Sequence, residues 1–275
     1  RITLLQSLAS IEADHGLVRS VGTSWIFDQH LVRDVLEADL PELLQTEYHA
    51  AIADALRARV DATGGNGPDG KAAVALCEHY LLGHRDTQAL DVLDSALDHL
   101  EAGYLNDQVL DLARRALDRP RLLEGARRAR LLLRVADRLN AAGRREEQEA
   151  AVDEALALAR DVEDPVLEFR GLVARGTLAW SLARTEQARA DFHAARGLAR
   201  RRGDRLCESQ AMGNLGVVAW GQGHLDEARE LFNGCRALAS EIGDPVVEAR
   251  AAGNLGHVAL ALGLRAAALR ADFAG

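Results

Sequence analysis

The chain has 275 residues, of which 48% are hydrophobic and 27% charged, an ordinary globular composition. Only 4% are aromatic and five are prolines, which favours long helices packed through small side chains over a β-sandwich. A net charge of −9 argues against nucleic-acid binding by the chain as a whole. No apolar run approaches the ~20 residues that span a bilayer, no signal peptide opens the chain, and the three cysteines are unclustered. We therefore expect a cytoplasmic protein with no membrane partner.

The first sixty residues have a pattern of their own. Apolar residues at positions 4, 5, 8 and 11 predict a short helix. Residues 16–20 and 24–27 then predict a pair of short strands. A helix over residues 27–36 and another containing residues 48–53 are expected to follow. We interpret residues 1–60 as one small element that ends in a trailing helix.

A glycine-rich loop is expected over residues 61–70. Within it, Gly65 to Lys71 meets the Gly-x4-Gly-Lys spacing of a phosphate-binding loop. Ala72, however, stands where a Ser or Thr hydroxyl would be needed for Mg²⁺, and the stretch follows an expected helix rather than a buried strand. We interpret it as a linker and expect no cofactor in this part of the protein.

Residues 71–120 resemble degenerate helical units, and from residue 121 an internal repeat becomes plain. A shift of 40 residues superimposes Gly213 to Gly216 on Gly253 to Gly256. So many coincidences at one period indicate a repeat architecture over residues 121–275. The same shift relates Asp164, Asp204 and Asp244; Gly176, Gly216 and Gly256; Trp180 and Trp220; Phe192 and Phe232; and Ala188, Ala228 and Ala268.

Each repeat is predicted to be a pair of antiparallel helices. In one repeat, residues 206–220 and 225–242 form the two helices around the break at 221–223. In the next, a helix over residues 246–262 is expected to end at Gly263. Asp244 and Pro245 are typical of a helix start. Because one hairpin cannot bury its own apolar face, the hairpins are expected to stack.

The repeat resembles the tetratricopeptide repeat in its longer variant. Leu215-Gly216, Ala228, Phe232 and the small Cys235 lie at the spacing of that family. The match runs over residues 122–272 and fades at the end, where Asp272 takes the place of the phenylalanine. The resemblance implies an all-α, right-handed solenoid of helical hairpins. Since the chain starts without Met and stops inside a repeat, we expect it to be a fragment.

Residues 1–60 are similar to the winged-helix domain and trailing helix that end the ATPase core of bacterial STAND and LuxR-type signalling ATPases. A Phe-x-His-x-Leu-Val-Arg string is usual there; alignment on Leu31, Val32 and Arg33 puts Gln29 at the histidine, with His30 one place late. Glu78 to Leu82 resembles the His-Tyr helix that begins the repeats of these proteins. The resemblance implies a sensor or scaffold region whose upstream ATPase domain is a partner within the same polypeptide.

No residue constellation in the sequence points to an enzyme. The nine histidines are scattered, and His79 and His84 lie five apart, which does not align them on a helix. Acidic pairs such as Asp226-Glu227 open helices, where they complement the helix dipole. The arginine cluster at 200–202 lacks interleaved aromatics, and the expected helix at 28–36 carries only Arg33 as a fixed cation. We expect no catalytic residue, no metal ligand and no nucleic-acid partner.

A functional surface is predicted on the concave face built by the first helix of each repeat. Gly216 and Ala219 are taken as packing residues, and helical turns counted from them give the residues on the opposite face of that helix. A shift of 40 residues in each direction then extends the set to ten residues. Asparagine both donates and accepts hydrogen bonds, so it suits the backbone of an extended peptide, and in the resembled family an Asn before the Leu-Gly pair often does this. The ten are Arg170, Thr177, Trp180, Gln210, Asn214, Val217, Trp220, Arg250, Asn254 and His257.

These residues are predicted to bind a peptide or protein partner. The arginines would supply charge complementarity and the tryptophans a rigid apolar contact. Packing between neighbouring repeats is the alternative for the two tryptophans, and a structural role is the alternative for the asparagines. At the level of the whole protein, the alternative is a ligand-sensing arm of an ATP-dependent transcriptional regulator that binds a small molecule.

Overall fold

A computed structural model describes residues 2–22, 24–27, 39–62 and 67–272 of the chain. The chain divides into two compact parts, Arg1–Gly103 and Tyr104–Gly275, which are described separately. Across the described residues there are twelve helices and one two-stranded sheet. The fold is therefore the all-α array of helical hairpins that the repeat predicts, with a small strand pair near the N-terminus.

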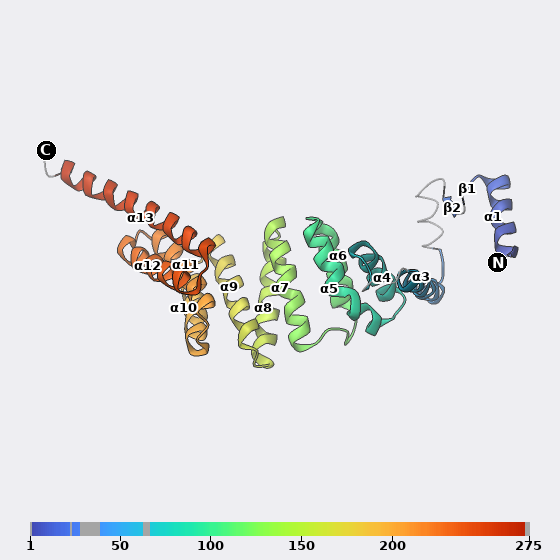
Figure 1. The fold of residues 1–275 in the computed structure, drawn as a ribbon, viewed down its shortest axis with the longest axis horizontal. Helices are drawn as coiled ribbons and strands as arrows, with labels where there is room; N and C mark the ends of the chain where they lie inside the picture. Colours follow the sequence, from blue (N-terminus) through green and yellow to red (C-terminus); the bar gives the residue numbers. More distant parts are fainter. Residues whose placement is uncertain (1, 23, 28–38, 63–66, 273–275) are drawn as a thin grey trace. The chain divides into compact units, whose positions relative to one another are not determined.

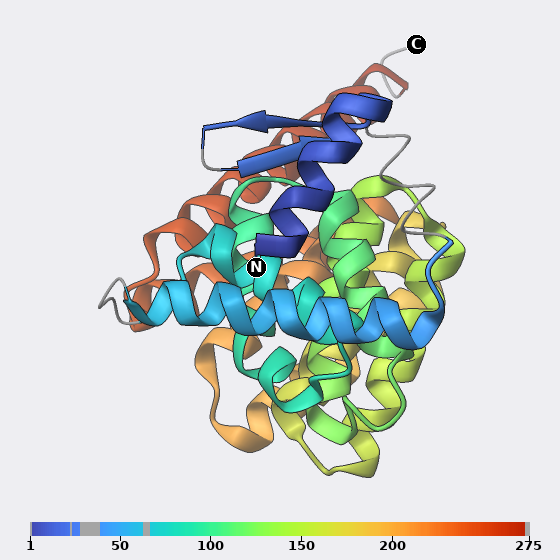
Figure 2. The ribbon, with the colours of Figure 1, turned by 90° about the vertical axis from the view of Figure 1, so that its right-hand side faces the viewer.

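The first part begins with a helix and a β-hairpin. Helix α1 (Ile2–His15) is followed by β1 (Val18–Val21) and β2 (Ser24–Phe27), which pair antiparallel. Figure 2 shows the two strands beside α1. Gly16, at φ +63°, turns the chain from helix to strand. The predicted helix and strand pair are confirmed, whereas the helix expected over 28–36, with its Gln29, lies outside the described residues.

Three longer helices complete the first part: α3 (Glu42–Ala62), α4 (Gly70–Leu82) and α5 (Asp86–Ala102). Helix α3 packs on α4, and α4 packs on α5. The carboxylate of Asp69 caps α4 by accepting a hydrogen bond from the Ala72 N–H at 2.8 Å. This carboxylate occupies the helix N-terminus, where a phosphate-binding loop would hold its phosphate. Residues 63–66 lie outside the described residues.

The second part is a stack of antiparallel helices (Figure 1). From α7 onward each helix packs on the next, and the first helices of neighbouring repeats also pack on one another. We call the surface carried by α7, α9, α11 and α13 the first-helix face. The helices are α6 (Asn106–Asp118), α7 (Gly125–Ala142), α8 (Arg145–Asp161), α9 (Pro165–Ser181), α10 (Thr185–Arg202), α11 (Arg205–Gly221), α12 (Leu225–Ile242) and α13 (Pro245–Asp272).

The 40-residue period is visible in the helix caps. Asp164 accepts hydrogen bonds from two backbone N–H groups at the start of α9, and Asp244 does the same at the start of α13. Asp204 caps α11 through the Cys207 N–H at 3.0 Å. Gly203, at φ +67°, ends the preceding helix in the left-handed conformation. An aspartate thus starts the first helix of three successive repeats, and the residue before it, Glu163, Gly203 or Gly243, is left-handed.

Close packing inside each hairpin also repeats. A Cβ at Gly176 would lie 2.7 Å from the Phe192 ring, and one at Gly216 would lie 2.6 Å from the Phe232 ring. Both phenylalanines are buried. Glycine on the first helix therefore lets a phenylalanine of the second helix lie directly against its backbone.

The prediction that the helix beginning near Pro245 ends at Gly263 is wrong. Helix α13 runs through Gly263 and continues to Asp272. Residues 264–270 are alanine, leucine and arginine, which are all strong helix formers. A single glycine inside such a stretch costs about 1 kcal/mol, which does not by itself stop a helix.

Among the described residues, none of the helices combines the length with the apolarity that a membrane span requires.

Candidate functional site

The ten predicted residues all lie on first helices of the second part. Arg170, Thr177 and Trp180 belong to α9, whereas four others lie on α11 and three on α13. Seven of the ten line one or the other of two pockets on the first-helix face. We name these the α7–α9 pocket and the α11–α13 pocket.

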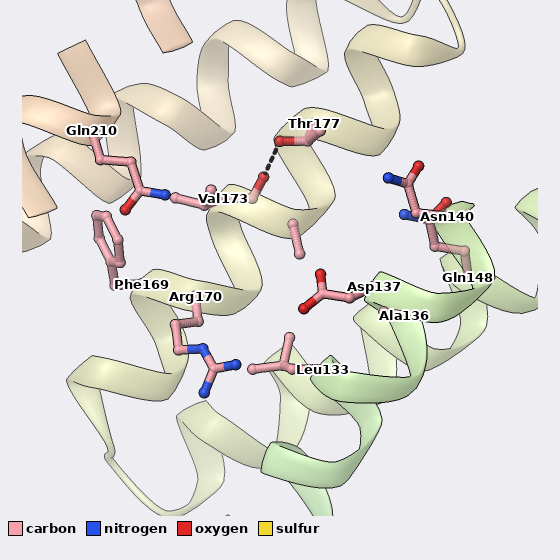
Figure 3. Close-up of a pocket in the computed structure, with 11 residues that line it drawn as sticks. Leu133, Ala136, Asp137, Asn140, Gln148, Phe169, Arg170, Val173, Thr177 and Gln210 are labelled. Atoms are coloured by element: carbon pink, nitrogen blue, oxygen red, sulfur yellow. Dashed lines mark hydrogen bonds between the residues drawn. The ribbon is translucent and has the colours of Figure 1, made fainter. Parts of the chain in front are cut away.

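The α7–α9 pocket has polar and apolar walls in similar measure and a volume of about 240 Å³. Figure 3 shows Asp137 of α7 and Arg170 of α9 extending into the space between these helices, with Gln210 of α11 at one side. The Thr177 hydroxyl donates to the Val173 carbonyl oxygen at 2.8 Å, so its proton is used within α9. The lining residues are Leu133, Ala136, Asp137, Asn140, Gln148, Phe169, Arg170, Val173, Ala174, Thr177 and Gln210.

The α11–α13 pocket is mainly apolar and has a volume of about 290 Å³. Its walls are Val217 and Trp220 of α11, Phe232 of α12, and Asn254 and His257 of α13. The Trp220 side chain is 45% exposed, and its ring centroid lies 6.4 Å from that of His257 with the rings tilted by 48°. Tryptophan at this exposure offers a large rigid apolar surface beside the amide of Asn254.

The two pockets occupy the same place in the repeat, two repeats apart. Adding 80 to the positions of four residues in the first pocket gives four residues of the second pocket. The array therefore presents one recess twice, first with mixed polar and apolar walls and then with mainly apolar, aromatic walls. The matched pairs are Asp137 with Val217, Asn140 with Trp220, Ala174 with Asn254, and Thr177 with His257.

In the repeat between the two pockets, Trp180 holds the position that Asn140 holds in the first pocket and Trp220 in the second. A Cβ on Gly221 would lie 2.2 Å from the Trp180 ring, so Trp180 packs directly on the end of α11. Trp180 is half-buried, as is Asn214, and Arg250 is exposed. These are the three predicted residues that line neither pocket. Packing between neighbouring repeats therefore accounts for Trp180, whereas the Trp220 side chain is only half-buried.

Three residues of the first-helix face were missed. Asp137 and Asn140 line the α7–α9 pocket, and Arg130 lies on the same helix. All three are found by carrying the shift of 40 one repeat further toward the N-terminus, from Thr177, Trp180 and Arg170. The signal was present in the sequence, because Gly143 already marks the same period in that repeat.

Ion pairs join the helices of neighbouring repeats. Arg160 bonds Glu168 at 3.1 Å, and one repeat later Arg200 bonds Glu208 at 2.8 Å. Glu208 is only 6% exposed, whereas the Arg200 side chain is 63% exposed, so the buried carboxylate is met by a cation at the surface. The repeated pair joins the end of a second helix to the following first helix. It adds a modest contribution to the apolar packing between these two helices.

No three His, Cys, Asp or Glu side chains in the described part of the chain are grouped so as to hold a metal ion. Burial raises the pKa of the Cys77 thiol to about 12, and burial with the nearby Asp204 raises that of Cys207 to about 11. The Nδ1 atoms of His49 and His79 lie 2.9 Å apart, joining α3 to α4.

Sequence comparison identifies a family over part of the chain. Residues 167–241 match the family model described as tetratricopeptide repeat. This segment comprises α9 to α12 almost completely and so includes residues from both pockets. No curated protein matches the chain in sequence.

Solved structures share the fold at low identity. A STAND protein with a tetratricopeptide repeat sensor from Pyrococcus horikoshii has a TM-score of 0.57 at 13% identity, over 94% of this chain and 43% of that protein. A Rap protein complexed with Competence and Sporulation Factor has a TM-score of 0.55 at 13% identity, over 84% and 74% of the two chains. The Rap conjugation gene regulator of plasmid pLS20, in complex with the Phr* peptide, gives 0.50 at 15% identity, over 88% and 76%.

Proposed function

We propose that the first-helix face binds an extended peptide segment of a protein partner. The observation that carries this proposal is the recurrence of one recess two repeats apart, with different walls each time. An extended chain laid across the first helices passes both recesses and places different side chains in them. The array thus has the form of an interaction module, and the fold is one in which a Rap regulator is found with a peptide.

The proposed contacts follow from the chemistry of the two pockets. Asn254 offers an amide that both donates to and accepts from a peptide backbone. Trp220 and Val217 offer apolar surface to one side chain of the partner. Arg170 and Gln210 supply hydrogen-bond donors at the other pocket. We propose no catalytic role for any of these groups.

A small-molecule sensor is less well supported by the geometry. The two pockets measure about 240 and 290 Å³, whereas small-molecule sites occupy about 300–1,000 Å³. Their separation by two repeats also prevents one small ligand from using both. A peptide uses several shallow recesses at once, and it is therefore the occupant that we propose.

We further propose that the chain is the sensor region of a larger signalling ATPase. Helix α1, the β1–β2 hairpin and α3, followed by the array, are in the order expected where a winged-helix domain and a trailing helix end an ATPase core. The similar fold of the Pyrococcus STAND protein supports this arrangement. The coding sequence upstream of Arg1 tests it: an in-frame nucleotide-binding domain is expected, and a different kind of domain there contradicts the proposal.

A displayed library of random twelve-residue peptides tests binding at the face. The complete chain is used as bait, and the selected peptides are resynthesised for fluorescence anisotropy. The test variant is Trp220→Ala with Asn254→Ala, and the control is Tyr104→Ala with Val162→Ala. Tyr104 and Val162 are exposed residues in loops at helix ends, outside both pockets. Circular dichroism confirms that every variant keeps its helices.

Peptides that bind the parent and the control, and that bind the test variant at least about tenfold more weakly, support the proposal. Peptides that bind all three proteins equally contradict it, because they dock elsewhere. A library that yields no binder under conditions that recover a known peptide-binding control protein also contradicts it.

A further inference from the structure

A row of arginines follows the first-helix face. Arg130 of α7, Arg170 of α9 and Arg250 of α13 occupy the same position of their repeats, and Gln210 of α11 fills the remaining place. All four side chains are exposed. Because successive first helices pack on one another, equal repeat positions form a continuous line across the face. We call Arg130, Arg170 and Arg250 the arginine row.

Over the described part of the chain the arginine row is unpaired, although the Asp137 carboxylate lines the same pocket as Arg170 (Figure 3). Within the described residues, none of its three guanidinium groups has a hydrogen bond or ion pair with a protein group. Neighbouring arginines of the same helices behave differently. Arg128, two residues before Arg130, bonds Glu154 at 2.5 Å, and Arg175, five residues after Arg170, bonds Asp191 at 2.6 Å.

This contrast is informative because the chain has 42 acidic residues against 33 basic ones. Carboxylates are therefore plentiful, and the pairs of Arg128 and Arg175 show that they reach arginines of the same helices. An unpaired line of arginines on the face that carries both pockets favours approach of an anionic partner. Guanidinium groups also match carboxylates geometrically through paired N–H donors.

We infer that the partner segment is acidic and carries an apolar anchor. Its carboxylates bond the arginine row, and one large apolar side chain enters the α11–α13 pocket beside Trp220. This inference rests on the proposed function and specifies the chemistry of the peptide. The occupant of the face is thus an extended acidic peptide and not a neutral or basic one.

The geometry also predicts the spacing within the peptide. Arg170 lines the α7–α9 pocket, and Trp220 lines the pocket two repeats further on. Arg170 and Trp220 themselves lie on adjacent first helices, α9 and α11, whose axes are about 8–10 Å apart. Trp220 is also ten positions further along its helix than Gln210, the counterpart of Arg170, which adds about 15 Å along the helix axis, so the two side chains start about 17–18 Å apart. An extended chain rises about 3.3 Å per residue. The carboxylate at Arg170 and the apolar anchor are therefore about five or six residues apart.

The peptides selected on the complete chain provide the probe. Their affinities are measured by fluorescence anisotropy against Arg130→Gln/Arg170→Gln/Arg250→Gln. The matched control is Arg115→Gln/Arg201→Gln/Arg236→Gln. These control arginines are also exposed, lie on α6, α10 and α12, and change the net charge by the same amount. Glutamine keeps the aliphatic part of the side chain and hydrogen-bonding capacity, so the comparison isolates the charge on the face.

The expected peptides are rich in Asp and Glu, with an aromatic or large aliphatic residue about five or six positions from a carboxylate. The row variant should bind them at least about tenfold more weakly, and the control within about twofold. Rising salt should reduce parental affinity more than that of the row variant.

Two results would overturn the inference in different ways. Selected peptides that need Trp220 and Asn254, but have no excess of acidic residues and bind the row variant normally, refute the acidic partner and leave the proposed function standing. Peptides that are insensitive to Trp220 and Asn254 refute both.

Discussion

Arg175 of α9 and Asp191 of α10 form a bidentate ion pair inside one hairpin. The next repeat has two leucines at the same positions. The Arg175 Nε donates to Asp191 Oδ2 at 2.9 Å, and its Nη2 donates to Oδ1 at 2.6 Å. Asp191 is only 5% exposed. Forty residues later the same positions are Leu215 and Leu231, both buried. One repeat thus uses a buried charge pair where its neighbour uses an apolar contact.

Replacing one partner should be far more damaging than replacing both. Arg175→Leu leaves a buried carboxylate without its cation and should reduce the free energy of unfolding by about 3 kcal/mol. Asp191→Leu should cost less, because Arg175 still lies 3.8 Å from Asp153. The double change recreates the pair found in the next repeat and should be within about 1 kcal/mol of the parent, or more stable.

Urea denaturation followed by circular dichroism provides the double-mutant cycle. The hydrogen bonds to Asp191 also raise the pKa of Arg175, in keeping with a strong pair. Additive losses in the double variant would show that the two side chains do not compensate each other, contrary to this prediction.

Gly216 and Gly256 occupy one repeat position but should respond oppositely to alanine. A Cβ at Gly216 would lie 2.6 Å from the Phe232 ring, whereas a Cβ at Gly256 would meet nothing within 4 Å. Gly216→Ala should therefore destabilise by about 1–3 kcal/mol through overpacking. Gly256→Ala should stabilise by up to about 1 kcal/mol, since alanine is the better helix former. Matched denaturation curves measure both; two changes of the same sign would contradict the packing argument.

Ala183 holds a backbone conformation for which other repeats use glycine. Its φ is +57°, and Gly143 and Gly223, 40 residues before and after it, have φ of +72° and +76°. Relief of strain in the left-handed region is worth roughly 1–2 kcal/mol, against about 0.5–1 kcal/mol for the greater freedom of unfolded glycine. Ala183→Gly should therefore stabilise by about 0.5–1 kcal/mol.

The reverse substitution is the control for that position. Gly223→Ala should destabilise by a similar amount, although a Cβ there meets no atom within 4 Å. Thermal unfolding of the two variants beside the parent tests the pair. An unfolding temperature for Ala183→Gly below that of the parent would mean that the left-handed conformation carries no relevant strain.

The helices and caps of the array were predictable because equivalent residues recur every 40 positions. Asp204 caps a helix and Gly216 admits Phe232 because each acts through local geometry that the spacing alone reveals. The end of α13 was not predictable in this way. Gly263 sits at a position where Gly223 turns the chain, yet the helix formers that follow Gly263 continue the helix.

The site was predictable in outline but not in detail. Trp180 and Trp220 hold one repeat position, and the sequence pattern treats them alike. The structure separates them, because Gly221 of the following repeat receives Trp180, whereas Trp220 is 45% exposed in a pocket wall. Asp137 was within reach of the same shift. Its part in the α7–α9 pocket follows from the stacking of α7 on α9, which is a property of the assembled array.

The rate at which the Cys207 thiol reacts should depend on the charge of Asp204. Burial and the hydrogen bond from its thiol to Asp204 raise the pKa of Cys207 to about 11, so at pH 8 about one thiol in a thousand is ionised. Iodoacetamide reacts with the thiolate, and native Cys207 should therefore label slowly, with a rate that rises about tenfold per pH unit. Asp204→Asn keeps an oxygen to cap α11 but removes the charge, which should lower that pKa and speed labelling several-fold.

Cys77 serves as the internal control in the same experiment. It is fully buried with a pKa of about 12, and it lies in the first compact part, so its labelling should be slow in both proteins. Mass spectrometry of tryptic peptides separates the two sites. Faster labelling of Cys207 alone, with unchanged circular dichroism, is expected. Acceleration at both cysteines would indicate general loosening of the array, and an unchanged rate at Cys207 would show that the Asp204 carboxylate does not control the thiol.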